Sequence, residues 1–139
     1  MEFTLEQGKH QKITLLDLGG VVFQSTGTSN REIDWKIISK LNQQYGAKMD
    51  LGEGLFSVFM LDYNSLTHQN LQGDQFLEKL FDTLKINEEL IDLLREKSDI
   101  IIVSDNYREN IAYISKRYHF EEWAIKQIYS YEYKMYKSN

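Results

Sequence analysis

The chain of 139 residues contains no cysteine and no proline. Without cysteine, disulfide bonds, thiolate metal sites and thiol nucleophiles are excluded. Without proline, the chain lacks a residue that commonly marks loops and helix ends. No apolar run approaches the ~20 residues needed to span a bilayer, so we expect no membrane segment.

Positive charge is also scarce, because 16 Lys and Arg face 21 Asp and Glu for a net charge of -5. A nucleic-acid-binding surface needs clustered Lys and Arg, so we expect no nucleic-acid partner. The N-terminus lacks the basic and apolar segments of a secretory signal, so we expect a cytoplasmic protein. The apolar content of 42% is enough for a core, and the length predicts one domain with at most a small insertion.

A run of apolar and β-branched residues over 13–18 predicts a buried strand, because solvent-facing strands alternate polar and apolar residues. Asp17 lies at its end and is followed by Gly19 and Gly20. A carboxylate at the end of a buried parallel strand lies where open α/β sheets bind ligands. The glycines allow a sharp turn and close approach of backbone N–H groups. An aspartate at this position can also cap a turn, so the run alone leaves both roles open.

The middle of the chain predicts helices. Residues 24–30 are polar and predict a linker, and residues 29–32 match a capping box that would start a helix. Gly46 is placed to end this helix, and Asn87 is placed to cap a later one. Apolar periodicity predicts further helices over 55–61, 74–84 and 88–97.

Two more strands follow. An apolar run over 100–103 ends at Ser104, and a short third strand is expected within 123–129. The order of strand, helices, strand, helix and strand predicts an α/β fold with a helical insertion after the first strand. If the first two strands are parallel neighbours, Asp17 and Ser104 face the same crevice. Taken alone, Ser104 is also a common helix N-cap residue.

Three segments together resemble motifs of the haloacid dehalogenase-like (HAD) hydrolase superfamily. Residues 15–22 resemble the first motif, whose leading aspartate is the nucleophile. Residues 100–106 resemble the second motif, an apolar strand ending in a phosphate-binding Ser or Thr. Residues 128–139 resemble the approach to the third motif, whose lysine maps to Lys137. The chain is most similar to the branch with a small helical cap directly after the first motif.

The resemblance implies a Rossmann-like, three-layer α/β core with a parallel sheet and an inserted helical cap. The core would comprise residues 1–24 and 86–139, and the cap would comprise residues 25–85. The family's fourth motif, an acidic pair, and the last strands of its sheet would lie beyond Asn139. We therefore expect a truncated form whose C-terminal strands are missing. Its first strand would then be an exposed apolar edge, which favours a homo-oligomer.

The resemblance further implies a Mg²⁺-dependent phosphatase that acts on a small phosphorylated metabolite through an aspartyl-phosphate. Asp17 would be the catalytic nucleophile, and Asp17 together with the backbone carbonyl of Gly19 would bind the metal. Donors and cations around the phosphoryl group would stabilise its charge. The implied phosphate-binding residues are Leu18, Gly19, Ser104, Asp105 and Lys137.

Two departures from the family pattern keep other functions open. Gly19 replaces the second aspartate of the first motif, the usual general acid, whose loss typically costs about 10²–10⁴-fold in rate. The cap or water would have to supply that proton. Ser138 stands where the family usually has proline. The alternatives are a HAD-like module that binds a partner or phosphate without turnover, and a 2-haloacid dehalogenase, which uses the same aspartate without a metal.

Overall fold

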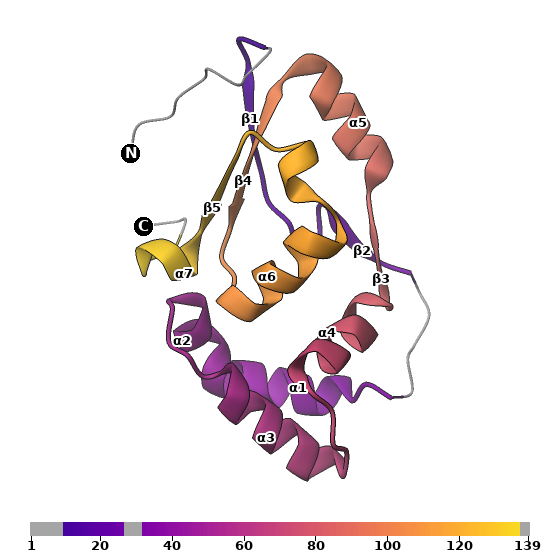
Figure 1. Cartoon of the computed structure of the whole chain (residues 1–139), viewed down its shortest axis with the longest axis vertical. Coiled ribbons are helices and arrows are strands. Elements are labelled where there is room, and N and C mark those ends of the chain that lie inside the picture. Colours follow the sequence, from indigo (N-terminus) through magenta and orange to yellow (C-terminus); the bar gives the residue numbers. More distant parts are fainter. Residues whose placement is uncertain (1–9, 27–31, 137–139) are drawn as a thin grey trace.

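The computed structural model describes residues 10–26 and 32–136 (Figure 1). Its strands are β1 (Ile13–Leu16), β2 (Phe23–Ser25), β3 (Leu84–Ile86), β4 (Asp99–Ser104) and β5 (Lys126–Tyr129). Its helices are α1 (Trp35–Leu41), α2 (Ala47–Asp50), α3 (Phe56–Thr67), α4 (Gly73–Phe81), α5 (Glu88–Lys97), α6 (Arg108–Arg117) and α7 (Ser130–Tyr133). A π-helical turn, η1 (Asn42–Gly46), joins α1 to α2, and a 3₁₀ turn, η2 (Phe120–Glu122), precedes β5.

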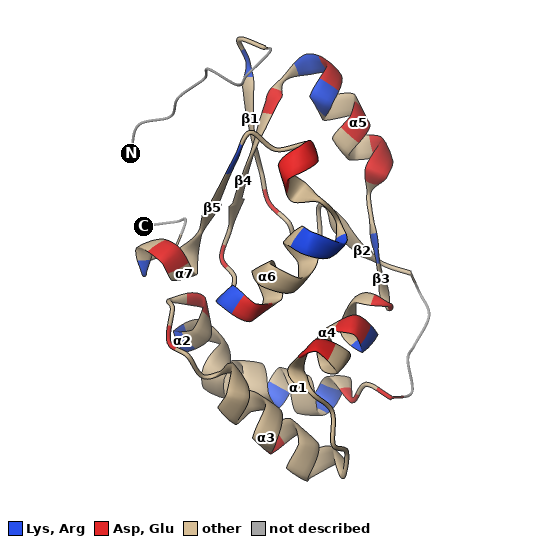
Figure 2. Ribbon diagram, viewed as in Figure 1, with Lys and Arg blue, Asp and Glu red and all other residues tan. Residues whose placement is uncertain are grey.

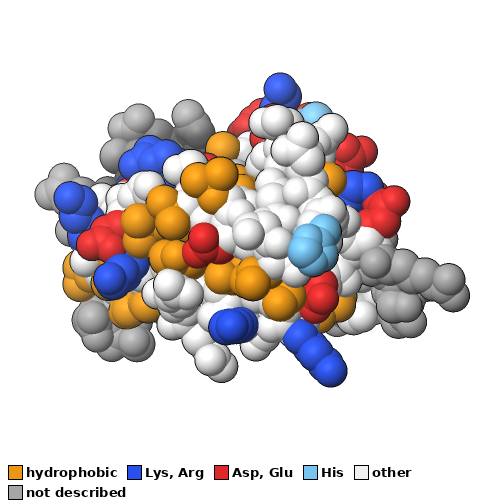
Figure 3. All heavy atoms as spheres, turned by 90° about the horizontal axis from the view of Figure 1, so that it is seen from below, with side chains coloured by type: hydrophobic (Ala, Val, Ile, Leu, Met, Phe, Trp, Pro, Cys, Tyr) orange, Lys and Arg blue, Asp and Glu red, His pale blue; other side chains and the backbone are white. Residues whose placement is uncertain are grey.

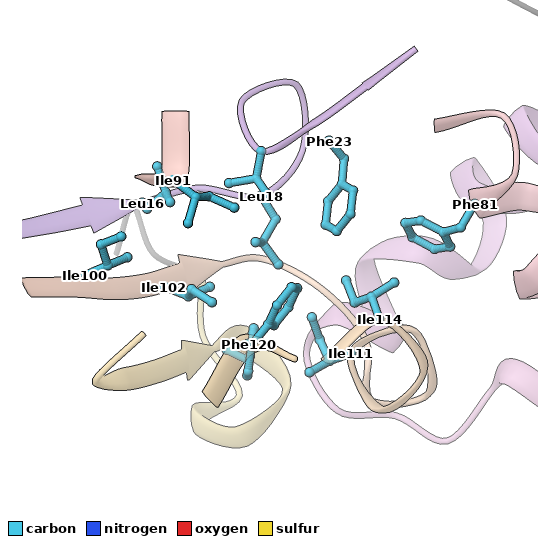
Figure 4. Packing of buried hydrophobic residues seen from close by; sticks show 12 residues of the cluster. Leu16, Leu18, Phe23, Phe81, Ile91, Ile100, Ile102, Ile111, Ile114 and Phe120 are labelled. Carbon is cyan, nitrogen blue, oxygen red and sulfur yellow. The ribbon is translucent and has the colours of Figure 1, made fainter. Parts of the chain in front are cut away.

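The core is a parallel three-stranded sheet in the order β1-β4-β5. The register aligns Leu16 with Ile102, and side chains alternate along a strand, so Leu16, Ile100 and Ile102 lie on one face. Residues of α5 and α6 pack against this face, including Ile91 and Ile111 (Figure 4). This arrangement confirms the predicted α/β fold with a parallel sheet.

Strand β1 differs from the fully buried strand that we predicted. It ends at Leu16, two residues early, and Leu15 and Ile13 are 66% and 39% exposed. The reason is its position at the edge, since within the described residues β1 pairs with β4 alone. Strand β4 does match the prediction, because Ile100, Ile101 and Ile102 are at most 1% exposed.

Strands β2 and β3 form an antiparallel pair that connects the core to the helical region. Phe23 aligns with Ile86 and Ser25 with Leu84, so the chain leaves through β2 and returns through β3 (Figure 1). The sequence did not predict these strands, because each has only three residues and β2 runs into a polar segment.

Helices α1 to α4, which we call the cap, have a hydrophobic cluster of their own. Tyr63, Phe59 and Phe76 lie at its centre, each at most 2% exposed. The ring centroids of Tyr63 and Phe76 are 4.9 Å apart, and the Tyr63 hydroxyl accepts a 3.1 Å hydrogen bond from the Asp34 backbone N–H. The cap therefore folds around its aromatic residues.

Helix ends follow local capping with two corrections. Helix α1 begins at Trp35, later than predicted, because Asp34 Oδ1 accepts from the N–H groups of Lys36 and Ile37. The predicted capping box lies largely outside the described residues. Gly46 does not end the helical path, which continues through η1 into α2. The prediction for Asn87 is confirmed, since its Oδ1 accepts from the Leu90 N–H at 3.1 Å.

Acidic and basic residues are interspersed over α4, α5 and α6 (Figure 2). The face of the cap seen in Figure 3 shows hydrophobic side chains between charged ones. On α3, Leu61 and Leu66 are 70% and 46% exposed. Within residues 10–26 and 32–136, no helix combines the length and the apolar character needed to cross a bilayer.

Candidate functional site

Asp17 follows β1 directly and is half-buried. The chain then makes a tight turn, in which the Leu18 carbonyl accepts hydrogen bonds from the N–H groups of Val22 and Phe23, each at 3.0 Å. Gly20 has a φ of 74°, a conformation that favours glycine. Leu18 is 1% exposed and anchors the turn in the core. Its N–H donates to Asp17 Oδ1 at 2.8 Å, so this amide orients the carboxylate.

Ser104 is the last residue of β4 and is 3% exposed. Since β1 and β4 are parallel and Leu16 aligns with Ile102, Asp17 and Ser104 lie at the carboxyl edge of neighbouring strands. This is the placement that the sequence predicted for parallel strands. The catalytic role of Asp17 and the phosphate-binding role of Ser104 stay predictions.

A cleft of about 460 Å³ separates this edge of the core from the cap. Its cap side is formed by η1 and α2, and its core side by the loop after β4 and the segment after α7. Acidic residues lie after the end of β4 and on α2 (Figure 2), and of these Asp105 and Asp50 line the cleft. The lining residues are Asn42, Gly46, Ala47, Asp50, Asp105, Asn106, Tyr107 and Tyr136.

Asp50 has the most perturbed carboxyl group of the cleft. Burial and, secondly, the negative charge of Asp105 raise the pKa of Asp50 to about 6. Burial also raises the pKa of Tyr107 and of Tyr136, so both phenols stay neutral near pH 7. The sequence did not single out Asp50, because it belongs to no motif and only the folded chain places it opposite Asp105.

Ser130 connects the two sides of the cleft and was also missed as a site residue. Its hydroxyl is buried, accepts from the Asn106 N–H at 2.9 Å, and lies 2.5 Å from the Asp50 carbonyl oxygen. Gly52 fits closely beside it, since a Cβ at Gly52 would lie 2.8 Å from the Tyr131 carbonyl oxygen. The end of α2 is thus held against α7 and the loop after β4.

Replacing Ser130 with alanine is expected to lower the free energy of unfolding by about 1–3 kcal/mol, because the Asn106 N–H and the Asp50 carbonyl lose a buried partner. Urea unfolding would measure the change. Ser57→Ala, at an exposed position of α3, is the matched control and should change stability by less than about 0.5 kcal/mol. Equal stability of the two variants would contradict the structural role of Ser130.

The remaining predicted residues are placed less closely together. Gly19 is exposed in the turn after Asp17, Asp105 is half-buried in the cleft, and Lys137 lies outside the described residues. Across residues 10–26 and 32–136, no three His, Cys, Asp or Glu side chains form a group suited to a metal. Mg²⁺ commonly needs only one or two protein carboxylates beside phosphate and water. A carboxylate such as that of Asp17 and a backbone carbonyl such as that of Gly19 are the kinds of oxygen ligand that Mg²⁺ prefers, and their role as metal ligands stays a prediction.

No protein-family model and no curated protein matches the sequence. Among solved structures, a HAD family enzyme from Bacteroides thetaiotaomicron matches as a mutant in complex with magnesium and inorganic phosphate, with a TM-score of 0.63 and 22% identity. The match covers 91% of this chain and 71% of that chain. The wild-type enzyme, also with magnesium and inorganic phosphate, matches with a TM-score of 0.60, 23% identity, and coverage of 91% and 72%.

A predicted HAD-like family hydrolase from Porphyromonas gingivalis also matches, with a TM-score of 0.54 and 19% identity over 92% of this chain and 70% of that chain. These similarities extend over both the core and the cap. They agree with the parallel order β1-β4-β5 and with the helices inserted between β2 and β3. The chain therefore has the fold of the HAD-like hydrolases.

Proposed function

We propose that the chain is a HAD-like, Mg²⁺-dependent phosphatase that acts on a small phosphorylated metabolite. The observation that carries the proposal is the parallel register of β1 and β4, which places Asp17 and Ser104 at one edge of the sheet. A carboxylate and a hydroxyl at this edge can engage the same phosphoryl group, the first as attacking group and the second as donor. The core–cap cleft is not lined by Asp17 or Ser104, but Asp105, which directly follows Ser104, does line it, and the cleft would take the organic part of the substrate.

In the proposed reaction, a carboxylate oxygen of Asp17 attacks phosphorus and forms an aspartyl-phosphate, which water then hydrolyses. The Leu18 N–H, which donates to Asp17 Oδ1, orients the nucleophile. The Ser104 hydroxyl would donate to a phosphoryl oxygen, and the N–H of Gly19 would add a second donor. Asp105 would line the phosphate side of the cleft, and Lys137 would add a positive charge.

Two features support magnesium as the cofactor. Asp17 and the Gly19 carbonyl would hold it, and it would neutralise charge on the phosphoryl oxygens. The Bacteroides enzyme, which shares this fold, was solved with magnesium and inorganic phosphate.

A module that binds phosphate without turnover is the second candidate. Gly19 favours it, because the residue two positions after Asp17 supplies no carboxylate. Such a module would bind inorganic phosphate or a phosphate ester and release no product.

The test is release of inorganic phosphate from a panel of phosphate monoesters, with Mg²⁺ and with EDTA. We expect turnover with Mg²⁺ and a loss of at least about 100-fold with EDTA, since the cation offsets the charge of the phosphoryl group. Phosphate binding without turnover would support the second candidate. Halide release from 2-haloacids in EDTA would instead indicate a dehalogenase. Either outcome would reject the phosphatase.

A further inference from the structure

The proposed phosphatase lacks a proton donor beside its nucleophile. The residue two positions after Asp17 is Gly19, which has no side-chain acid. An alkoxide is a poor leaving group, so a positioned acid is worth about 10²–10⁴-fold. In-line displacement puts the leaving oxygen on the side of phosphorus opposite to the attacking oxygen. The donor must therefore approach from the side of the site away from Asp17.

Asp50 is the acid of the cap that lies nearest to this requirement, because it lines the cap side of the core–cap cleft. It is the last residue of α2, and it lines the core–cap cleft opposite Asp105. Asp105 directly follows Ser104, the last residue of β4, so Asp50 faces the segment that continues this strand. Asp17 and Ser104 themselves do not line the cleft, so a substrate would reach from their edge of the sheet past Asp105 into it. Of the residues that line this cleft, Asp50 is the only carboxylic acid contributed by the cap.

The surroundings of Asp50 favour its protonated form. Burial and the charge of Asp105 raise the pKa of Asp50 to about 6, close to the range suited to general acid catalysis. The groups that face it from the core are Asp105 after β4, Tyr107 before α6, and Tyr136 after α7. The stem of Lys134 lies beside Gly52, two residues further along the chain.

The backbone of Asp50 is also fixed. The Ser130 hydroxyl donates a 2.5 Å hydrogen bond to the Asp50 carbonyl oxygen, although the two residues are 80 positions apart in sequence. The close approach of Gly52 to the Tyr131 carbonyl holds the next turn of chain against α7. Asp50 is the last residue of the helical path that runs from α1 through η1 into α2, and these contacts fix that end of the path.

We propose that Asp50 is the general acid that protonates the leaving oxygen of a phosphate ester whose organic group lies in the core–cap cleft. This inference rests on the proposed phosphatase activity. As Asp17 forms its bond to phosphorus, the bond from phosphorus to the leaving oxygen breaks, and that oxygen keeps the electron pair and takes the proton of Asp50. In the second step a water oxygen attacks phosphorus, the bond from phosphorus to the Asp17 oxygen breaks, and Asp17 leaves as a carboxylate with the electron pair. Inorganic phosphate is released, and the proton given up by the water returns to the Asp50 carboxylate.

The test compares Asp50→Asn with wild type on two kinds of ester. With alkyl phosphates we expect kcat to fall by about 10²–10⁴-fold, because the alcohol leaves without a proton. With para-nitrophenyl phosphate we expect a fall of less than about tenfold, because this phenolate leaves readily without protonation. Glu53→Gln, an exposed position three residues away with the same charge change, should match wild type on both esters.

The pH dependence gives a second readout. In wild type, kcat/KM for alkyl phosphates should decrease as pH rises through about 6, since Asp50 loses its proton there. Asp50→Asn should lack this decrease. Equal losses on both esters, or an unchanged pH profile, would overturn the role of Asp50 while leaving the phosphatase intact. A wild type that hydrolyses only the aryl ester would overturn it as well, whereas absence of turnover on both esters would reject the phosphatase itself.

Discussion

Asp17→Asn is expected to reduce phosphate release by at least about 10³-fold, because an amide cannot form the acyl-phosphate bond. The fold should tolerate this change. Asparagine keeps an Oδ1 that can accept the Leu18 N–H, as Asp17 does at 2.8 Å. Asp17 also lies outside the regular hydrogen bonding of β1, which ends at Leu16. The measurement is initial rate with Mg²⁺ and a phosphate monoester in excess.

Asp92→Asn is the matched control, since Asp92 is exposed on α5 and the change removes the same charge. The rate of Asp92→Asn should equal that of wild type. In urea unfolding, the free energy of unfolding of both variants should lie within about 0.5 kcal/mol of the wild-type value. Full activity of Asp17→Asn would exclude the nucleophile role. A loss of activity together with a loss of stability would instead mean that Asp17 stabilises the turn after β1.

Phe120→Ala is expected to lower the free energy of unfolding by about 3–5 kcal/mol, the range for removing a buried aromatic ring. Phe120 is fully buried in η2, and its ring centroid lies 5.2 Å from Trp123 and 6.3 Å from Phe23. Figure 4 shows the ring between Ile102 of the sheet and Ile111 of α6. Truncation would leave a cavity bordered by β4, β2 and α6, which a domain of this size cannot easily collapse.

Leu93→Ala provides the comparison for Phe120→Ala, because Leu93 is a large apolar residue of α5 that is 50% exposed. Its effect should be below about 1 kcal/mol. Chemical denaturation of both variants would measure the difference. A Phe120→Ala variant as stable as Leu93→Ala would show that η2 does not contribute to the core as the structure places it.

Local features of the fold could be predicted well. The continuous apolar run of β4, the helix α5 over 88–97, and the N-cap hydrogen bond of Asn87 all appear where the sequence predicted them. A helix, α6, also lies between β4 and β5, as the predicted order required. Each depends on residues within one or two turns of each other. The apolar pattern by itself predicted that Leu15 is buried, because such a run does not reveal whether its strand is central or at an edge. The family resemblance predicted an exposed edge strand, and within the described residues β1 is one.

The candidate site divides in the same way. Asp17 and Ser104 could be identified from the sequence, because each ends an apolar strand and a known motif surrounds it. Asp17 and Ser104 lie at one edge only because β1 pairs in parallel with β4. This pairing had to be assumed from the sequence and could not be predicted. Asp50 and Ser130 had no local signal, since what distinguishes them is a contact across 80 residues.

The sequence by itself determined the α/β class, the position of Asp17 at the end of the first apolar run, and the presence of glycine rather than a carboxylate at position 19. These follow from residue type, apolar periodicity and spacing, which are properties of short segments. Only the tertiary structure decided how α2 meets the loop after β4, and that Asp50 becomes a weakly acidic group in a cleft. The physical reason is that the burial of Asp50 and its closeness to Asp105 depend on segments that are far apart in the sequence and meet only in the folded chain.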